Sequence, residues 1–419
     1  MQPGALVELA TELVRQVLRF DAPADAVVAE FFRRHRAPGP RDRHTLVEIA
    51  YTVLRRRPLL THLAQSGRDG IERRLALLAW PGNAAFVRTA LSAQEIDWLD
   101  QAGRVDVAAL PERLRHNLPE WLAARLQDEV GAGFWPLVEA LDRPAALDLR
   151  VNVAKASRDA VPAALAKQGI AAHATRYAPA GLRLEGRPAL NKLDVFARGE
   201  VEVQDEGSQL LALLVGARRG EMVADFCAGA GGKTLALGAA MRNSGRLYAF
   251  DVSASRLAGL KPRLARSGLS NVYPVQIAHE RDDRLERLAG KLDRVLVDAP
   301  CSGLGTLRRS PDLKWRQTPE TVAAMAVRQA AILASAARLT KPGGRLVYAT
   351  CGLLRAENEA IAEAFDAAHG GAFRVVPAAE ALRRAQVAEA DTLTDGPYLR
   401  TWPHRHATDA FFAAVWERA

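Results

Sequence analysis

The chain has 419 residues, a formal net charge of +9 and an isoelectric point near 9.8. Hydrophobic residues make up 49% and charged residues 25%, which are values of a folded globular protein and exclude disorder as its main state. No apolar stretch reaches the roughly eighteen residues of a membrane span, and acids interrupt the apolar N-terminus, so we expect neither a membrane segment nor a signal peptide. We therefore expect a cytoplasmic protein of two or three domains, whose basic surface favours a polyanionic partner.

Residues 1–142 show apolar residues at helical spacing from Leu6 to Leu141, and strand-like alternation is almost absent. Proline and glycine breaks separate the helices at Asp21–Pro23, Ala37–Pro40 and Trp80–Asn83. This segment is predicted to be an all-helical domain. Its basic residues bracket one loop and are Arg33, Arg34, His35, Arg36, Arg41, Arg43, His44, Arg55, Arg56 and Arg57. Such a cluster suits a phosphate backbone, although solvated helix faces are the alternative.

The predicted secondary structure changes after this segment from helices alone to a mixture of strands and helices. Residues 143–203 carry short β-like runs at Leu147–Val153 and Gly181–Glu185 around a helix-like Ser157–Lys167, which predicts a small α+β domain. Residues 204–419 alternate strands and helices. The predicted strands are Met222–Phe226, Arg246–Phe250, Arg294–Val297 and Arg345–Ala349, and helices are expected after Lys233, from Ser253 and over Pro319–Leu339. This order predicts an α/β fold with a doubly wound parallel sheet covered on both faces.

Each of the three cysteines closes an apolar, strand-like run: Cys227, Cys301 and Cys351. Because ligands and chemistry collect at the carboxyl ends of parallel strands, we expect the three thiols to converge on one site. The cysteines are far apart in sequence and none forms a Cys-x-x-Cys pair, so we expect free thiols, no structural zinc site and no other metal.

A glycine-rich loop, Asp225–Thr234, follows the first of these strands and leads into a helix. It fails the phosphate-binding loop pattern, which needs glycine at the position of Cys227, and the dinucleotide pattern, which needs glycine at Thr234. The loop is paired with Asp251, which ends the second strand and is placed to accept a ribose hydroxyl. S-adenosylmethionine, with a ribose and no phosphates, fits this pair, although Asp251 could instead cap the next helix.

The two remaining cysteines lie in Asp298–Gly303 and Ala349–Cys351. Carbon 5 of cytosine is too poor a nucleophile to take a methyl group unaided, but addition of a thiolate at carbon 6 makes the ring an enamine that can attack the methyl donor. Asp298 is placed to act as the acid at ring nitrogen N3. Removal of the carbon 5 proton then gives the second thiol a task. Small buried hydrophobes are the alternative interpretation of both cysteines.

These residues resemble the RNA cytosine-5 methyltransferases of the Nol1/Nop2/Sun family. The resemblance covers Asn117 to Phe365 most strongly and rests on several motifs. They are Leu118–Leu122, Leu149–Asn152, Val203–Gln209, the glycine-rich loop, Asp298–Gly303, Arg308–Trp315, Lys341–Gly344 and Tyr348–Cys351. The helical order of the N-terminus and Tyr51–Arg56 are similar to the NusB-like domain of the bacterial methyltransferase B group (Sun/Fmu), which acts on 16S ribosomal RNA.

The resemblance implies a class I, Rossmann-like methyltransferase domain over residues 204–419. It is preceded by an RRM-like or ferredoxin-like domain over 143–203 and a NusB-like RNA-binding domain over 1–142. It implies Cys351 as the nucleophile, with Cys301 assisting release of the methylated base, and Lys233 pointing toward the catalytic end. The implied cofactor contacts are Cys227, Ala228, Gly229, Ala230, Gly231, Gly232, Lys233, Asp251, His279 and Asp298.

Three positions depart from the family pattern. Gly229 and Ala230 replace the usual Ala-Pro, Ala410 replaces a usual glycine, and His279 stands where an acid usually contacts the adenine amino group. We expect a monomeric enzyme that uses S-adenosylmethionine on structured RNA. The alternatives are the same chemistry on transfer RNA, or an RNA-binding ribosome assembly factor that keeps the fold with weak turnover.

Overall fold

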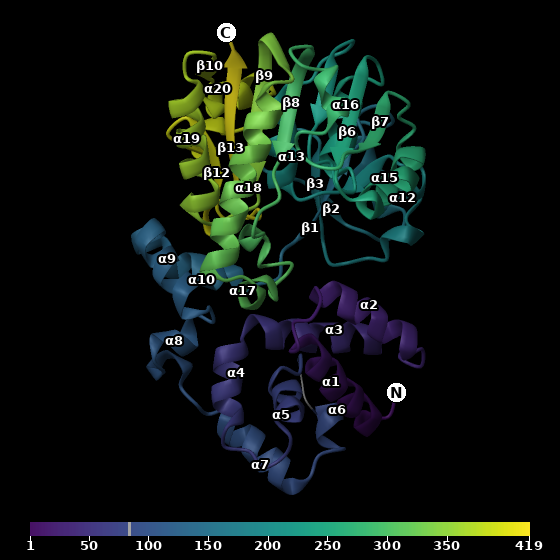
Figure 1. Cartoon of the computed structure of the whole chain (residues 1–419). Helices are drawn as coiled ribbons and strands as arrows, with labels where there is room; N and C mark the ends of the chain where they lie inside the picture. Colours follow the sequence, from purple (N-terminus) through teal and green to yellow (C-terminus); the bar gives the residue numbers. More distant parts are fainter. Residues whose placement is uncertain (83–84) are drawn as a thin grey trace. The chain divides into compact units, whose positions relative to one another are not determined.

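The structure, a computed structural model, describes residues 1–82 and 85–419 in two compact units (Figure 1). One unit comprises Met1–Pro144 and Thr306–Pro319, and the other comprises Ala145–Gly305 and Glu320–Ala419. The segment 306–319 therefore belongs to the first unit although its sequence lies among the α/β elements. The three-part division at residues 142 and 203 stays a prediction.

The first unit is built of helices, as the apolar spacing predicts. Its elements are α1 (Pro3–Val17), α2 (Ala24–Arg34), α3 (Pro40–Arg55), α4 (Arg57–Ala64), α5 (Ile71–Leu78), α6 (Ala85–Arg88), α7 (Ala93–Ala102), η1 (Val107–Ala109), α8 (Glu112–Arg115), α9 (Glu120–Val130), η2 (Gly131–Gly133), α10 (Phe134–Leu141) and α17 (Leu313–Arg316). The predicted break at Trp80–Asn83 ends at a residue that lies outside the described ones. A core that includes Leu13, Leu46 and Ile49, all fully buried, joins α1 and α3.

The segment around α17 caps two helices of this unit. The Lys314 Nζ donates a 2.7 Å hydrogen bond to the Arg55 carbonyl, and the Trp315 Nε1 donates a 2.6 Å bond to the Leu54 carbonyl. These carbonyls end α3, where no intrahelical donor is left for them. At the start of α2, the backbone N–H of Ala24 donates to Asp312 at 3.3 Å. A cation at a helix C-terminus and a carboxylate at an N-terminus each complement the helix dipole.

The second unit begins with a small antiparallel sheet in the order β2-β3-β1-β4. Its elements are β1 (Leu147–Val151), α11 (Ala160–Ala166), β2 (Ala172–Ala174), β3 (Gly181–Leu184), η3 (Leu190–Lys192), α12 (Asp194–Ala197) and β4 (Val201–Val203). A separate core of apolar residues from these strands and helices holds it together. This confirms the α+β character predicted for the segment.

The main sheet of the second unit has nine strands, eight of them in the order β11-β12-β13-β9-β8-β5-β6-β7, with β10 paired to β13. Its strands are β5 (Met222–Asp225), β6 (Arg246–Asp251), β7 (Val272–Gln276), β8 (Leu292–Asp298), β9 (Thr340–Thr350), β10 (Phe373–Val375), β11 (Thr394–Asp395), β12 (Tyr398–Thr401) and β13 (Phe411–Arg418). The helical elements around it are α13 (Glu206–Val215), α14 (Gly232–Ala240), α15 (Ala254–Ser267), α16 (Asp283–Glu286), η4 (Leu304–Thr306), α18 (Pro319–Ala337), η5 (Arg355–Glu357), α19 (Glu359–His369), α20 (Ala378–Arg384), η6 (Ala390–Leu393) and α21 (Pro403–His406).

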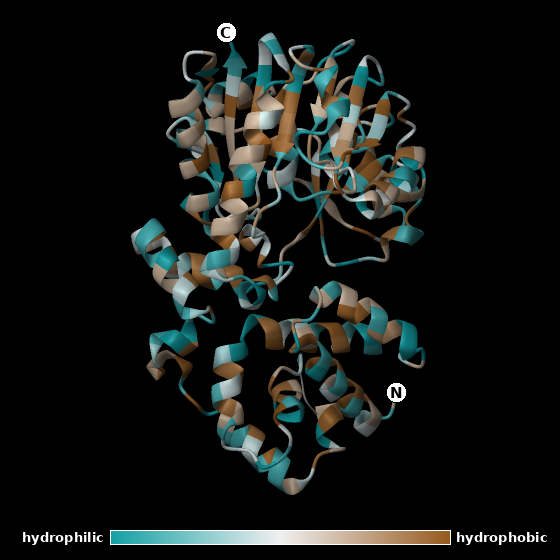
Figure 2. Cartoon of the chain, viewed as in Figure 1, coloured by the Kyte–Doolittle hydropathy of each residue, from teal (hydrophilic) through white to brown (hydrophobic). Residues whose placement is uncertain are grey.

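Both faces of this sheet are covered, because successive strand side chains point to opposite sides. Along β9, Val347 packs into a core shared with α13, α14, α15 and α20, whereas Leu346 and Tyr348 pack into a second core shared with α16, α18 and α19. The buried part of a central strand is correspondingly apolar on both faces, as in residues 295–297 of β8, a strand that is brown over part of its length in Figure 2. The structure confirms the doubly wound fold.

The predicted parallel sheet is incomplete at one edge. Strands β5 to β9 pair in parallel, but β13 pairs antiparallel with β9, and β12 and β10 pair antiparallel with β13. The strands predicted from the apolar runs are all present, whereas the C-terminal antiparallel strands were not predicted. Among the described residues, no helix has the length and apolarity needed to cross a membrane, and no cluster of three or more metal-ligating side chains occurs.

The buried ammonium of Lys314 makes the stability of the helical unit depend on pH. The side chain is 3% exposed, and burial lowers the pKa of Lys314 from 10.5 to about 7. Between pH 7 and 10.5 the unfolded chain therefore binds more protons than the folded chain, so the free energy of unfolding rises with pH in this window, by up to about 1.4 kcal/mol per pH unit.

We expect Lys314→Met to remove this contribution. The thermal unfolding midpoint of the variant should gain less than that of the wild type between pH 7 and pH 9, measured by calorimetry at both pH values. Lys192→Met, which changes an exposed lysine, is the matched control and should follow the wild type. Parallel pH curves for wild type and Lys314→Met would contradict a buried, proton-losing lysine.

Candidate active site

The strand order brings the three cysteines to one edge of the main sheet. Strands β9, β8 and β5 are neighbours, and Cys351, Cys301 and Cys227 follow their carboxyl ends. The Cys301 and Cys351 sulfurs lie 3.3 Å apart in hydrogen-bond contact. All three cysteines are free thiols. The expected convergence is therefore found, and it is closest for the pair that was expected to work together.

The hydrogen bond with Cys351, reinforced by burial, raises the pKa of Cys301 well above its usual range. Cys301 therefore rests as a protonated thiol, and it becomes a strong base when it loses that proton. Burial likewise raises the pKa of Cys227, whose side chain packs against the apolar core between the sheet and α18. Cys227 thus contributes a small apolar side chain and its backbone.

A lysine and an acid complete the charged part of the site. The Lys233 Nζ, in the first turn of α14, donates a 2.7 Å hydrogen bond to Asp298, the last residue of β8. Burial acts to lower the pKa of Lys233, but the charge of Asp298 and its hydrogen bond outweigh burial, and Cys351 adds to the effect, so the pKa is raised. Lys233 is thus a cation close enough to Cys351 for the two side chains to interact electrostatically.

Asp251 holds the glycine-rich loop in place. Its carboxylate accepts hydrogen bonds from the backbone N–H of Gly229 at 2.8 Å and of Ser253 at 2.7 Å. The cap of α15 is Ser253, whose Oγ accepts from the backbone N–H of Arg256. The alternative of Asp251 as the helix cap is therefore wrong. Each carboxylate oxygen has a second lone pair that remains available to a hydroxyl group.

Two glycines of the loop both have positive φ angles but differ in the space around the position of a Cβ atom. Gly231 has φ +83°, and a Cβ there would lie 2.2 Å from the Leu260 Cδ1, so the backbone packs tightly on α15. Gly229 has φ +55°, and a Cβ there would meet no atom within 4 Å. The loop thus turns away from α15 and borders open space before the helix α14 begins at Gly232. The loop and Asp251 together fit a nucleoside ligand that hydrogen-bonds to Asp251 and lies against the backbone of the glycine residues.

A buried carboxyl group lies beneath this loop and was not singled out from the sequence. Asp225, the last residue of β5, is 1% exposed, and its carboxylate accepts a 2.7 Å hydrogen bond from the Thr234 Oγ1. Burial raises the pKa of Asp225 to about 7, against the opposing effect of that hydrogen bond. Its link to Thr234 joins the beginning of the loop to the helix that follows it. The signal available in the sequence was an acid at a strand end.

His279 lies in the turn after β7, beside the strand that carries Asp251. Its Nδ1 accepts a 3.1 Å hydrogen bond from the backbone N–H of Arg281, and the side chain is exposed. Close in sequence, Asp282 accepts hydrogen bonds from the backbone N–H groups of Ala278 and Arg284, which lower the pKa of Asp282. An acid is therefore present in this turn, three positions beyond the expected one.

Two buried residues beside the thiols were also missed. Glu357 and Asn358, both 0% exposed, hydrogen-bond to Ser302 and Thr350, which adjoin Cys301 and Cys351. In the sequence, these two residues are visible only as an acid followed by an amide shortly after Cys351.

Ala410, which replaces the glycine usual in the family, is fully buried, and its N–H donates to the carbonyl of Gly305 at 3.0 Å.

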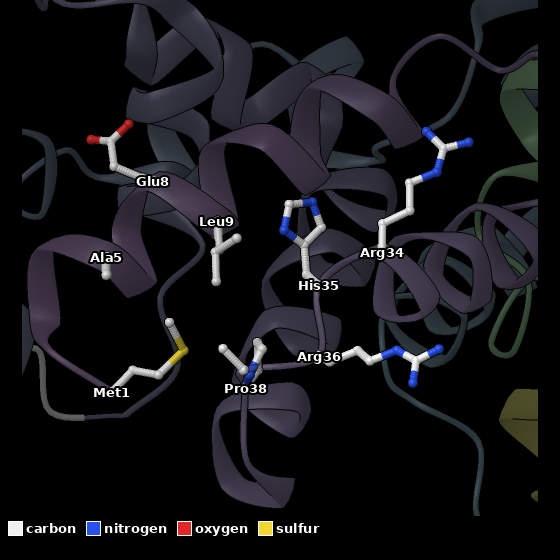
Figure 3. A pocket seen from close by; sticks show the side chains of 9 residues that line it. Met1, Ala5, Glu8, Leu9, Arg34, His35, Arg36 and Pro38 are labelled. Carbon is white, nitrogen blue, oxygen red and sulfur yellow. The ribbon is translucent and has the colours of Figure 1, made fainter.

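The basic cluster of the helical unit is only partly exposed. Arg55 is 5% exposed, so the expectation that it faces a phosphate backbone is wrong, since its guanidinium donates to the Arg308 carbonyl within the unit. Arg34 is exposed and pairs with Glu30. Figure 3 shows Arg34 and Arg36 beside an open hollow of about 580 Å³ between α1 and the turn after α2. The exposed members that remain are Arg33, Arg34, Arg36, Arg41, His44 and Arg56.

Comparison with known proteins identifies the family. Residues 212–417 match the family model of the 16S rRNA methyltransferase RsmB/F, and residues 118–191 match the RsmF/B-like ferredoxin-like domain. The chain is 31% identical to a Synechocystis protein described as "Probable ribosomal RNA small subunit methyltransferase B", covering 98% of this chain and 99% of that protein. It is also 31% identical to the ribosomal RNA small subunit methyltransferase B of Vibrio cholerae, covering 78% and 81%.

Solved structures agree with this relationship. The crystal structure of a protein named PH0851 has a TM-score of 0.81 and 26% identity, covering 100% of this chain and 99% of that one. A methyltransferase homolog from Pyrococcus horikoshii has a TM-score of 0.63 and 27% identity, covering 75% and 100%. The chain belongs to the RsmB/F family of 16S rRNA methyltransferases, enzymes that act on RNA with S-adenosylmethionine as cofactor.

Proposed function

We propose that this methyltransferase modifies carbon 5 of a cytosine in 16S ribosomal RNA through a covalent adduct with Cys351. The observation that carries the proposal is the 3.3 Å contact between the Cys301 and Cys351 sulfurs beside the Lys233–Asp298 pair. Methylation at an exocyclic amino group or a hydroxyl would need no nucleophile of this kind. Two adjacent thiols, of which Cys301 has a raised pKa, match a reaction that needs a nucleophile first and a base later.

Cys351 is the nucleophile in this scheme. Its sulfur adds to carbon 6 as the thiolate and moves electrons toward carbon 5 and N3, and the Lys233 ammonium is close enough to interact with that charge. In this scheme Asp298 and the Lys233 ammonium, which are hydrogen-bonded to each other, stabilise the developing charge at N3. S-adenosylmethionine supplies the electrophilic methyl group that carbon 5 takes. The chain's own task is to hold the base and donor so that this carbon faces the methyl group.

Cys301 then serves as the base. While Cys351 carries negative charge or hydrogen-bonds to Cys301, the pKa of Cys301 is high and its proton stays. After carbon 6 is bonded to the Cys351 sulfur, that charge is gone, and Cys301 can release its proton to solvent. As a thiolate it accepts the carbon 5 proton, the bond between carbon 6 and sulfur breaks, and the methylated base leaves.

We assign the cofactor to the loop at the edge of the sheet. The contacts we propose are Cys227, Ala228, Gly229, Ala230, Gly231, Gly232, Lys233, Asp251, His279 and Asp298. The support is the open space at Gly229 and the position of Asp251, a buried carboxylate with lone pairs to spare for the ribose hydroxyls. His279 would contact the adenine side. We further propose that the enzyme acts as a monomer.

Replacing each thiol separately tests the role assignment. We expect Cys301→Ala, incubated with the cofactor and RNA, to accumulate a protein–RNA adduct that survives denaturing electrophoresis, because the carbon 5 proton is no longer removed. Cys351→Ala should form no adduct and incorporate no tritium-labelled methyl group. Ser157→Ala, an exposed change outside the residues assigned to the site, is the control and should retain methyl transfer. Activity in Cys351→Ala together with loss of activity and of adduct in Cys301→Ala would reverse the assignment.

Bisulfite sequencing of 16S ribosomal RNA from cells with and without the gene tests the product and the substrate together. We expect one cytosine to be protected only when the gene is present. If gene-dependent protection were confined to transfer RNA, the substrate would be transfer RNA instead. If no cytosine were protected although the protein still bound RNA, the assembly-factor alternative would be favoured.

The exposed basic residues of the helical unit should bind RNA phosphates. We expect the double variant Arg36→Gln and Arg41→Gln to weaken RNA binding and to reduce the slope of log affinity against log salt by roughly 1–2, because each phosphate contact releases counterions. Filter binding at several salt concentrations measures the slope. Arg104→Gln with Arg113→Gln removes the same charge from other exposed sites of the unit and should leave the slope unchanged. Equal slopes in all three proteins would contradict this role.

A further inference from the structure

Two consecutive buried residues, Glu357 and Asn358, lie beneath the two cysteine turns. Both side chains belong to residues that are 0% exposed, and they join η5 to α19 shortly after Cys351. Neither residue has a thiol, a ring or a reactive position of its own in the proposed reaction. Their hydrogen bonds, however, reach Ser302, which follows Cys301, and Thr350 and Gly352, which flank Cys351.

Glu357 fixes the turn that carries Cys301. Its carboxylate accepts a 2.7 Å hydrogen bond from the backbone N–H of Ser302 and another from the Ser302 hydroxyl. It also accepts from the Gln329 Nε2 at 3.1 Å, and this same amide group donates to the Pro300 carbonyl at 3.0 Å. Ser302, which follows Cys301, is thus bonded directly to this carboxylate, and Pro300, which precedes Cys301, is linked to it through the Gln329 amide.

Asn358 fixes the turn that carries Cys351. Its Oδ1 accepts from the Thr350 hydroxyl, and its Nδ2 donates to the Gly352 carbonyl at 3.1 Å. The Gly352 N–H closes the ring by donating to the Thr350 Oγ1 at 3.2 Å. A Cβ on Gly352 would lie 3.2 Å from Asn358 Oδ1 and 3.3 Å from Glu357 Oε2, so the turn is packed directly on these two side chains.

The two residues are joined by one planar peptide bond, which holds their Cα atoms at a fixed separation of about 3.8 Å. The backbone carbonyl of Glu357 is itself fixed by a 2.6 Å hydrogen bond from the Tyr348 hydroxyl. The Gly305 N–H also donates to the Cys351 carbonyl at 2.8 Å, which ties the segment after Cys301 to the other turn. The two cysteine turns are therefore connected by a short network of hydrogen bonds through Glu357 and Asn358.

We propose that Glu357 and Asn358 are positioning residues that set the distance between the Cys301 and Cys351 sulfurs for the thiol relay; the proposal rests on the proposed function. A buried carboxylate costs desolvation free energy, and an apolar side chain would stabilise a core at least as well. The carboxylate instead fixes the directions of three hydrogen-bond donors, which are the backbone N–H and the hydroxyl of Ser302 and the side-chain amide of Gln329.

The test uses the full-length protein without RNA or cofactor, and measures how fast Cys301 and Cys351 close to a disulfide. Diamide takes up the two thiol hydrogens, and mass spectrometry of digests identifies the bond formed. We expect Glu357→Ala and Asn358→Ala each to slow closure at least tenfold. Glu357→Gln should restore most of the rate, because its amide oxygen can accept from the backbone N–H of Ser302 and its amide nitrogen can donate to the Ser302 hydroxyl.

Matched controls come from the same unit. Glu206 is a buried glutamate whose carboxylate accepts from the backbone N–H groups of Tyr177 and Ala178, and Asn152 is a buried asparagine that donates to the carbonyls of Gly199 and Ser267. Glu206→Ala and Asn152→Ala remove comparable hydrogen bonds elsewhere. They should leave the closure rate unchanged, so a general loss of stability is separated from a loss of thiol alignment.

In the methyl-transfer assay, Glu357→Ala and Asn358→Ala should lower kcat at least tenfold with little change in KM for RNA, and Glu357→Gln should recover activity. If the alanine variants do not fold, Ser302→Ala and Thr350→Val remove the hydroxyl groups that bond to Glu357 and Asn358, one in each turn, and should slow closure in the same way. Closure at the wild-type rate in folded Glu357→Ala and Asn358→Ala, or in both milder variants, overturns the proposal. Methyl transfer that persists in Cys351→Ala overturns the proposed function instead, and the closure rates still decide whether these residues align the thiols.

Discussion

Parallel pairing of β5, β8 and β9 is the constraint on which the site depends. These three strands are neighbours in the sheet, and their paired residues run in register from Val223 through Arg294 to Arg345. Since parallel strands end at the same edge, one residue type placed after each strand is enough to gather a site from positions that are far apart in sequence. The Lys233–Asp298 pair depends on the same edge, because α14 starts where the loop after β5 ends.

The chemistry of the site is set by unequal surroundings of similar groups. Cys301 and Cys351 are the same residue type at two neighbouring strand ends, yet only Cys351 lies close enough to influence the pKa of the Lys233 ammonium, while Cys301 has Glu357 as its nearby charge. Cys227, at the third strand end, has apolar neighbours and a carboxylate environment that keep it protonated. Local charge and burial, rather than residue type, thus distinguish the surroundings of the three thiols.

Much of this arrangement could be predicted from the sequence. The apolar runs before Cys227, Cys301 and Cys351 gave the strands, and the failed phosphate-loop spacing pointed to a nucleoside without phosphates. The antiparallel edge at β13 could not be predicted, because Phe411–Arg418 is apolar on both faces like a parallel strand. Glu357 and Asn358 were missed because buried polar residues are recognised by their partners, and the partners lie in other turns. The same reason hid Lys314, whose acceptor precedes it by more than two hundred residues.

The capping of α2 and α3 by residues 312–315 has a consequence for how the protein is made. A chain leaving the ribosome exposes its N-terminal end first, and domains generally fold as they emerge. The ends of these two helices must nevertheless wait for Asp312, Lys314 and Trp315, which are synthesised only after β8. The helical unit is thus finished late although it is translated early, and its completion requires that strands β5 to β8 of the main sheet have already been synthesised.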